Sequence, residues 1–360
     1  MFSLIRTFAD VEQKVCIFTG ARPNFVKVAP IIRAINRTDG ISYQLVYAGS
    51  ADDPTLEPSL FNDLQMPQPD VCLGVGCENL NELTGLVMAK FERYLEQHST
   101  DTVIVVDDLA STMAAAIVTK KRGLRLAHLV AGTRSFDIHM PKEINRLVID
   151  GLSDLLFTAG VGASSIATRE GAELQKIYMV GNILMDSLRH SRNRWQRPDF
   201  LGEDPYLVLT LNRRALLADK ENLQRMLTAI SEAAGKHRVI APLRGLAAET
   251  VLKLQHSLTI VAPLSYLEFG YLTSHALGVI TDSGNVAEEA TFNNVPCITL
   301  NSYTEHQDTV KVGTNVLVGE DADLLRTALT DMVQGRWKQG SLPDRWDGRT
   351  AERIVQTLLA

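Results

Sequence analysis

The amino-acid sequence predicts an α/β protein with two doubly wound domains, each built on a parallel sheet. Short apolar runs alternate with longer segments of helical period, which is the β-α-β rhythm of such sheets. The rhythm stops at a polar stretch rich in Arg, residues 186–205, and then restarts. The length of 360 residues also suits two domains that each bury a core.

In the first half of the chain, the expected strands are short and almost wholly apolar. They are residues 14–20, 43–49, 101–108, 125–132 and 155–160. Helices are expected at residues 24–37 and at the small-residue stretch 109–123, and the Asn-Arg pair at 145–146 is placed on a further helix.

The second half repeats the pattern. Strands are expected at residues 206–212, 238–243, 258–263, 278–284 and 296–301, and helices at residues 220–236, 267–276 and 286–294. The predicted domains are residues 1–188 and 206–345, joined by a linker or crossing segment at 189–205. Residues 346–360 are expected to form a C-terminal helix that packs back across the domains.

Composition narrows the functional classes. The net charge of −6 offers no basic surface for nucleic acid. No apolar run reaches the ~18 residues of a membrane helix. The start, MFSLIRTFADVEQK, lacks a signal-peptide core and is interpreted as a short amphipathic extension. Cys16 and Cys297 are expected to be buried thiols, and the cysteine pattern predicts neither a zinc site nor a cofactor. We therefore expect a cytoplasmic protein without nucleic-acid or membrane partners.

The stretch TGARPNFVK lies at the first strand-to-helix turn. Gly20 permits a tight turn, and Pro23 suits the first turn of a helix. Arg22 and Lys27 are predicted to reach an anion there, helped by the backbone N–H groups of the helix start. The alternative is a structural turn with exposed charges.

A second turn of this kind reads TDSGNVAEEA. The backbone N–H groups of Ser283, Gly284 and Asn285 are predicted to cradle a phosphate. Glu289 is predicted to accept hydrogen bonds from a ribose diol. Glu288 is interpreted as an acidic residue that complements the helix dipole, and the same interpretation stays open for Glu289.

Three further residues complete the candidate site. Pro263 and Phe269 are expected to form an apolar slot for a flat base, although their composition is equally typical of a core. The strand VVDDLAST ends on two aspartates, which are costly to bury without partners. Asp108 is the candidate active-site carboxylate, and Asp107 is interpreted as a cap of the following helix.

The ordered motifs resemble those of one known family. They include TGARPNFVKVAP, VVDDLAST, HLVAGTRSFDIHMPKEINR, VGNILMDSL, LTLNRR, TDSGNVAEEA and TEHQDTVKVGTNVLVG. From about Lys14 to the C-terminus the chain resembles the non-hydrolysing UDP-N-acetylglucosamine 2-epimerases. The resemblance implies a GT-B fold with two Rossmann-like domains, a UDP-sugar in the cleft between them, and a homodimer.

The family inverts C2 of the sugar by eliminating UDP and adding it back to the other face of a glycal. It uses carboxylates and a histidine to move protons. Here Asp108 matches the family aspartate, but Val130 and Lys142 replace two glutamates and Asn212 replaces the histidine. Asp108 and Glu143 remain as the catalytic candidates, with Asp137 and Lys142 as the other candidate substitutes.

The nucleotide side keeps more of the family pattern. The candidate substrate-binding residues implied by the motifs are Arg22, Lys27, Arg134, Arg146, Arg213, Arg244, Pro263, Phe269, Ser283, Gly284, Asn285 and Glu289. Ala51 and Arg244 stand where the family has histidines, and Asn301 and His306 stand where it has arginines.

These substitutions predict a family member of amino-sugar and polysaccharide metabolism whose epimerase activity is weak or absent, because each lost acid or base removes about 10²–10⁴-fold in rate. One alternative is a catalytically silent, regulatory paralogue that binds a nucleotide sugar or partners an active paralogue. Another is a GT-B enzyme for glycosyl transfer or UDP-sugar hydrolysis, in which Lys142 and Arg244 assist the leaving diphosphate.

Overall fold

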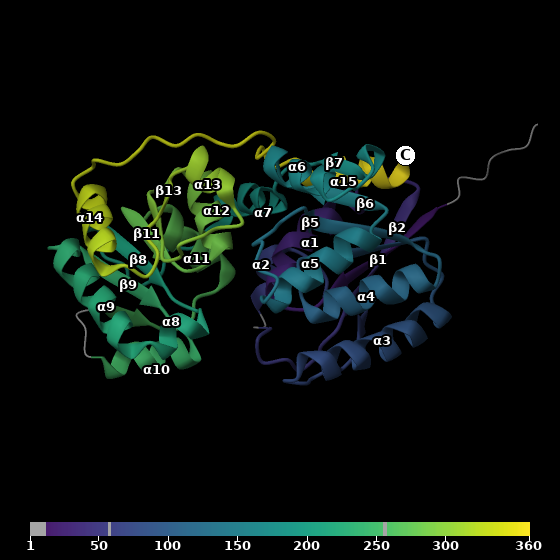
Figure 1. Cartoon of the computed structure of the whole chain (residues 1–360), viewed down its shortest axis with the longest axis horizontal. Coiled ribbons are helices and arrows are strands. Elements are labelled where there is room, and N and C mark those ends of the chain that lie inside the picture. Colours follow the sequence, from purple (N-terminus) through teal and green to yellow (C-terminus); the bar gives the residue numbers. More distant parts are fainter. Residues whose placement is uncertain (1–11, 57–58, 255–257) are drawn as a thin grey trace, which may run out of the picture. The chain divides into compact units, whose positions relative to one another are not determined.

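The structure is a computed structural model that describes residues 12–56, 59–254 and 258–360. The amphipathic extension expected at the start of the chain lies, up to residue 11, outside the described residues. Contacts divide the chain into two compact units (Figure 1). Unit 1 is the described part of Met1–Ser187 together with Arg349–Ala360, and unit 2 is the described part of Leu188–Gly348.

Unit 1 is built on a parallel sheet of seven strands in the order β3-β2-β1-β4-β5-β6-β7. The strands are β1 (Gln13–Thr19), β2 (Ile41–Tyr47), β3 (Val71–Cys72), β4 (Thr102–Val106), β5 (Arg125–Ala131), β6 (Leu155–Thr158) and β7 (Ile177–Met179). All five residues of β4 are buried, as expected for an apolar strand with helices on both faces of its sheet.

Helices cover both faces of this sheet. They are α1 (Arg22–Ile35), α2 (Ser59–Leu64), α3 (Leu80–Gln97), α4 (Ala110–Lys121), α5 (Pro141–Leu152), α6 (Val161–Arg169), α7 (Ile183–Ser191), which runs into unit 2, and α15 (Thr350–Leu359). Figure 1 shows α3, α4 and α5 side by side, and α4 packs against both neighbours. Its small residues Ala114, Ala115 and Ala116 are fully buried because α4 is the middle helix of this layer.

The C-terminal helix α15 belongs to unit 1, where it packs against α1. The carboxylate of Asp186 accepts hydrogen bonds from the backbone N–H groups of Thr350 (3.1 Å) and Ala351 (2.9 Å). It therefore satisfies amides that the first turn of a helix leaves without intrahelical partners. The end of the chain is in this way joined to a helix more than 160 residues earlier.

Unit 2 has a six-stranded parallel sheet in the order β10-β9-β8-β11-β12-β13. Its strands are β8 (Tyr206–Thr210), β9 (Arg238–Pro242), β10 (Thr259–Val261), β11 (Gly278–Thr281), β12 (Cys297–Thr299) and β13 (Asn315–Leu317). Its helices are α8 (Arg214–Ala218), α9 (Lys220–Ala234), α10 (Gly245–Lys253), α11 (Tyr266–Ser274), α12 (Gly284–Phe292), α13 (Gln307–Lys311) and α14 (Ala322–Val333).

The predicted α/β class is confirmed, and every strand predicted from an apolar run is present. Cys16 and Cys297 are buried as expected, and burial raises the pKa of each thiol to about 12. The short strands β3, β7 and β13 were not predicted from the sequence, because two or three half-buried residues give no clear periodicity. In the described ranges no helix is long and apolar enough to cross a bilayer.

Candidate functional site

Each sheet has one point at which the strand order reverses, and parallel sheets bind ligands at the carboxyl ends of the strands beside such a point. In unit 1 this switch point lies between β1 and β4, which pair directly. In unit 2 it lies between β8 and β11. The predicted motifs follow these four strands, so both switch points carry candidate residues.

At the switch point of unit 1, a buried polar cluster joins the start of α1 to the end of β4. The side-chain oxygen of Asn24 accepts hydrogen bonds from the backbone N–H groups of Gly20 (2.8 Å) and Ala21 (3.2 Å). Its amide nitrogen donates to Asp107 (2.8 Å), and the ammonium of Lys27 donates to the other oxygen of Asp107 (2.5 Å). The cluster fixes the first turn against the neighbouring strand end.

One interpretation from the sequence is corrected by this cluster, whereas the predicted contact of Lys27 with an anion stays a prediction. Asp107 does not cap α4, whose N-cap is Leu109; instead it binds α1 from a left-handed backbone conformation with φ of 60°. Lys27 is 5% exposed and forms an ion pair with Asp107, so its charge is already matched inside unit 1. Arg22 is half-buried as the first residue of α1, with Pro23 next, so the turn itself is as predicted.

Gly20 is required by a close approach, not by its backbone angles. A Cβ atom at this position would lie 2.1 Å from the hydroxyl oxygen of Ser111 on α4. The residue does not have a positive φ. The prediction of a glycine at a tight turn was therefore right in place but wrong in its physical reason.

The α5 helix holds the end of β4 through its Asn-Arg pair. The side-chain amide of Asn145 donates to the backbone oxygen of Asp108 (2.8 Å), and the guanidinium of Arg146 donates to its carboxylate (2.8 Å from Nε). Arg146 also pairs with Glu143 at 3.0 Å. The exposed Lys142 lies 3.5 Å from the second carboxylate oxygen of Asp108. The two catalytic candidates thus share one arginine.

Glu143 is 3% exposed and supports the loop that precedes its own helix. Its carboxylate accepts the backbone N–H groups of Ser135 (2.9 Å) and Phe136 (2.8 Å) and the Ser135 hydroxyl (3.0 Å). Burial raises the pKa of Glu143, but these hydrogen bonds and Arg146 outweigh burial and hold the pKa below its ordinary value. The group is an ionised loop anchor.

Asp108 is also held in its charged form. Burial raises its pKa, but the charges of Lys142 and Arg146 lower it more, and the pKa lies below the ordinary value for aspartate. A carboxylate with a depressed pKa is a weaker base toward carbon acids. Asp108 therefore remains at the candidate site with reduced basicity.

Val130 occupies a strained bulge. Leu129 pairs with Phe157 and Ala131 pairs with Thr158, so Val130 is an extra residue in the pairing of β5 with β6. Its φ of 75° is a left-handed conformation that is rare for a β-branched residue. Bulges of this kind re-aim side chains and are common beside active sites. Here the re-aimed side chain is aliphatic.

Beneath the bulge lies a buried ionic network that the sequence analysis missed. Asp150 binds the ring of His128 (2.6 Å) and the guanidinium of Arg134 (2.8 Å). Arg134 also pairs with Glu170, and it is 2% exposed. Burial raises the pKa of Asp150, but His128 and Arg134 lower it by more. The pKa therefore lies below the ordinary value for aspartate. The assignment of Arg134 to nucleotide binding is not supported by this geometry, because its guanidinium is committed to two carboxylates.

At the switch point of unit 2, one carboxylate organises the end of β8. Asp282 accepts the backbone N–H groups of Asn212 (2.6 Å) and Arg213 (2.7 Å). The side chain of Asn212 is exposed, whereas the guanidinium of Arg213 forms an ion pair with Glu320. The sequence predicted neither this meeting of two strand ends nor the carboxylate partner of Arg213.

The turn after β11 opens α12 as predicted. Ser283 is the N-cap, and Gly284 and Asn285 are the first two helical residues. A Cβ atom at position 284 would lie 2.5 Å from Nε2 of His306, so glycine is needed for the close approach of this ring. The other ring nitrogen, Nδ1, is 2.7 Å from the carboxylate of Glu288.

Glu288 is therefore a partner of His306, and its interpretation as a helix-dipole residue is corrected. Both side chains are largely buried. Glu289 is half-buried on the same helix, as its predicted role requires. Pro263 is exposed, Phe269 is half-buried on α11, and Arg244 is exposed as the N-cap of α10.

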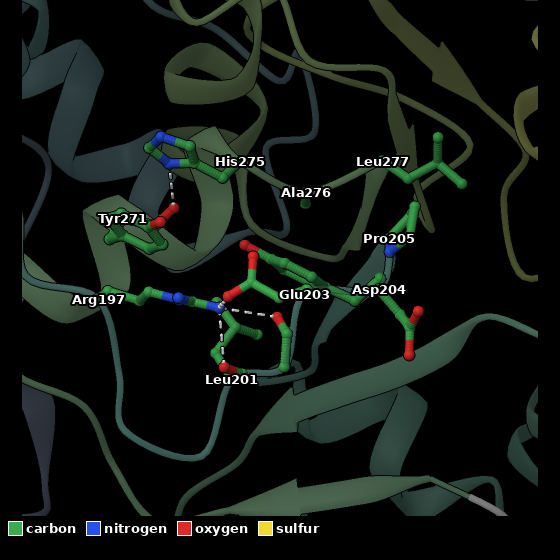
Figure 2. Close-up of a pocket in the computed structure, with 11 residues that line it drawn as sticks. Arg197, Leu201, Glu203, Asp204, Pro205, Tyr271, His275, Ala276 and Leu277 are labelled. Atoms are coloured by element: carbon green, nitrogen blue, oxygen red, sulfur yellow. Dashed lines mark hydrogen bonds and ion pairs between the residues drawn. The ribbon is translucent and has the colours of Figure 1, made fainter.

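A hollow of about 390 Å³ lies elsewhere on unit 2 (Figure 2). Tyr206 begins β8 and Leu277 precedes β11, which places the hollow at the amino edge of the sheet. Its arginine, Arg197, pairs with Glu203 at 2.7 Å. None of the predicted site residues lines it, so it is separate from the switch point. Within the described residues, no three His, Cys, Asp or Glu side chains gather as a metal site.

Comparison with known proteins decides the family. Residues 33–359 match the family model described as UDP-N-acetylglucosamine 2-epimerase. The UDP-N-acetylglucosamine 2-epimerase of Methanocaldococcus jannaschii is 33% identical over an alignment of 365 positions. The alignment covers 96% of this chain and 98% of that protein. This chain belongs to the UDP-N-acetylglucosamine 2-epimerase family.

Further epimerase relatives agree with this assignment. The crystal structure of the M. jannaschii enzyme in complex with UDP-GlcNAc and UDP has a TM-score of 0.84 at 32% identity, covering 96% of this chain and 99% of that one. The UDP-2,3-diacetamido-2,3-dideoxy-D-glucuronate 2-epimerase of Pseudomonas aeruginosa is 32% identical over 333 residues, 89% of this chain and 94% of that protein. The predicted GT-B architecture is confirmed.

Within this epimerase-family fold, the sequence motifs located the switch-point residues well and their partners poorly. Asp108, Glu143 and Arg146 come together as a cluster, as do Ser283, Gly284 and Asn285. His128 begins the motif HLVAGTRSFDIHMPKEINR but was interpreted only as part of a strand, and Asp150, Glu170 and Glu320 were missed because they lie outside the motifs. One signal for this pair was present in the sequence. His128 lies on the strand before the small-residue turn, and Asp150 lies on the helix that follows the turn.

Proposed function

We propose that this chain binds a UDP-sugar, UDP-N-acetylglucosamine or a relative, and epimerises it slowly or not at all. The binding half is supported by the relative that was crystallised with UDP-GlcNAc and UDP at 32% identity. It is also supported by the β11–α12 turn, where Ser283 and Gly284 present backbone N–H groups at a switch point. Glu289, on the same helix, is proposed to contact the ribose diol.

The proposal of slow turnover depends mainly on one observation. Asp108 and Glu143 are both held as charged carboxylates by their partners. Epimerisation requires one group that takes the C2 proton as UDP is eliminated, and another that delivers a proton to the opposite face of C2 as UDP adds back. Glu143 accepts three hydrogen bonds from the loop and a fourth from Arg146, so it cannot accept a proton without releasing the loop. Asp108 is neutralised by Arg146 and Lys142.

The remaining positions do not supply the missing proton carrier. Val130 has no ionisable group, and the Asn212 amide does not act as a base near neutral pH. The side chain of Lys142 is 58% exposed and pairs with the carboxylate of Asp108 at 3.5 Å. Loss of groups that act as a unit lowers rates by orders of magnitude, without simple additivity.

The direct test is hydrogen exchange at C2. The protein is incubated with UDP-N-acetylglucosamine in deuterated water, and deuterium at C2 and the manno epimer are followed by NMR. We expect exchange at least ~100-fold slower than with an active epimerase of the family under the same conditions. Exchange at a family-like rate would contradict the proposal. Release of UDP without epimer would instead favour the hydrolytic alternative.

A gain-of-function variant tests whether only the acid–base groups are missing. We expect the triple variant Val130→Glu, Lys142→Glu, Asn212→His to raise the exchange rate at C2. The matched control carries Val130→Gln with the other two changes, because glutamine has the size of glutamate but no titrating proton. Equal rates in the two variants would count against a missing proton carrier at this position.

The assembly is proposed from the family resemblance, and the location is proposed from the amino-acid sequence. We propose a cytoplasmic homodimer that regulates or accompanies an active paralogue. Analytical ultracentrifugation of the pure protein, alone and with such a paralogue, measures both associations. A monomer at micromolar concentration would contradict the homodimer.

A further inference from the structure

We infer that the His306–Glu288 pair makes the binding of the diphosphate proton-dependent, with the protonated imidazole as a direct contact of the phosphates. The inference rests on the proposed binding of a UDP-sugar at the α12 turn and adds a residue and a condition to it. It concerns a position where the resemblance places an arginine.

The geometry puts the imidazole at the start of α12. Its Cδ2–Nε2 edge occupies the space that a Cβ atom of residue 284 would need, at 2.4 and 2.5 Å. Gly284 is the first residue of the helix, so this edge lies beside the backbone N–H groups that are proposed to hold the phosphates. A side chain at this place adds to the phosphate-binding groups of the turn.

Glu288 fixes which edge of the ring faces that turn. Its carboxylate lies one helical turn after Gly284 and binds Nδ1 at 2.7 Å. The two side chains are 18% and 7% exposed, so solvent screens the pair weakly. A carboxylate on Nδ1 stabilises the imidazolium form and directs Nε2 toward Gly284.

The charges near the pair are of both signs. The segments around α12 and His306 carry the charged side chains Asp282, Glu288, Glu289, Glu305, Asp308, Lys311, Lys338, Asp344 and Arg345. Asp308 follows His306 closely, and burial, together with Glu288 and Asp344, raises its pKa against the opposing effects of Lys311 and His306. The positive end of the α12 dipole opposes the imidazolium, and a bound diphosphate removes that opposition.

The expected consequence is a proton taken up from solvent when the UDP-sugar binds. Unlike an arginine, a histidine changes its charge between about pH 5 and 8. Affinity for the diphosphate is therefore highest at acid pH and falls as the imidazole loses its proton. UDP-N-acetylglucosamine is the suitable probe, because each of its phosphates is esterified and keeps its charge across this range.

The test is calorimetric titration of the full chain with UDP-N-acetylglucosamine at about pH 6 and about pH 8.5. We expect about tenfold weaker binding at the higher pH, because the neutral ring keeps its proton on Nδ1 toward Glu288 and has no hydrogen on Nε2 to donate to a phosphate. At pH 7, buffers of different ionisation enthalpy should give different heats, which reports proton uptake without any variant. Heats that do not depend on the buffer would overturn the inference.

Three variants test whether His306 is the group that takes up the proton when the UDP-sugar binds. His306→Arg should bind equally at both pH values, and Glu288→Gln should show a smaller pH dependence than the wild type. His237→Gln is the matched control, because this histidine lies ahead of β9 at the opposite edge of the sheet, and it should behave like the wild type. The same pH dependence in His306→Arg as in the wild type contradicts the inference but leaves the proposed function intact. Absence of binding at both pH values contradicts both.

Discussion

At the scale of single residues, Val130 combines a strained backbone with an aliphatic side chain. Its left-handed backbone and its extra place in β5 are features that aim a side chain out of a strand. Such strain costs of order 1–3 kcal/mol and persists when the surrounding structure holds it. The strained backbone at this position carries a side chain that has no ionisable group.

The strain at Val130 predicts that glycine is more favourable than alanine at this position, which is the reverse of the usual order in a strand. We expect Val130→Gly to be more stable than Val130→Ala by about 1 kcal/mol, because glycine adopts positive φ without a Cβ penalty. Both variants remove the valine side chain, so the difference isolates the backbone. Urea unfolding of the two proteins measures it. Ala127→Gly, in the regular part of β5, should instead lower the free energy of unfolding; a gain of stability there would undermine the comparison.

At the scale of elements, the loop before α5 depends on one carboxylate. Glu143→Gln should lower the free energy of unfolding by about 2 kcal/mol at neutral pH, because a buried charge that accepts several hydrogen bonds is lost. Amide hydrogen exchange at Ser135 and Phe136 should be faster in the variant. Unchanged protection of these two amides would show that the loop is held by other contacts.

The pH dependence of this anchor has a defined direction. The folded-state pKa of Glu143 lies below its unfolded value of about 4.3, so the stabilisation is complete above about pH 5. It is lost as the pH falls through the folded-state value. The stability difference between wild type and Glu143→Gln should therefore shrink below about pH 4. A difference that stays constant down to pH 3 would contradict the assignment.

The attachment of α15 is a second element-level contact with a measurable strength. Asp186→Ala should lower the free energy of unfolding by about 1–2 kcal/mol, because two helix-start amides lose their acceptor. Asp186→Asn keeps one acceptor oxygen and should lose less. Urea titration monitored at Trp346, which precedes α15, would follow the loss.

At the scale of the whole molecule, the same topological device occurs twice. The switch point of unit 1 carries Asp108, the proposed catalytic carboxylate, and the switch point of unit 2 carries Asn212 and the turn that is proposed to bind the phosphates. Gly284→Val should therefore weaken UDP binding by about 10–100-fold, because the added side chain collides with His306. Val130→Ala should leave UDP affinity unchanged. Calorimetry with UDP compares the two, and a large loss in Val130→Ala would break the proposed division.

The sequence predicted the fold and the turns that carry the candidate residues because both depend on local signals. Apolar runs mark the strands, and small residues mark the turns after β1 and β11. The partners of those residues could not be predicted, since pairings such as Lys27 with Asp107 or Arg213 with Glu320 join segments about 80 to 107 positions apart. Without these partners, arginines and lysines that are already neutralised look available for a phosphate.

The attachment of α15 also bears on how the protein is made. The last helix covers α1, yet the ribosome releases it only after all of unit 2 has been synthesised. The N-terminal sheet is therefore synthesised early. The apolar face of α1 stays uncovered while unit 2 is translated. Domains that complete themselves from both chain ends lose the benefit of folding in order of synthesis. Newly made copies of this chain should accordingly be clients of chaperones until translation ends.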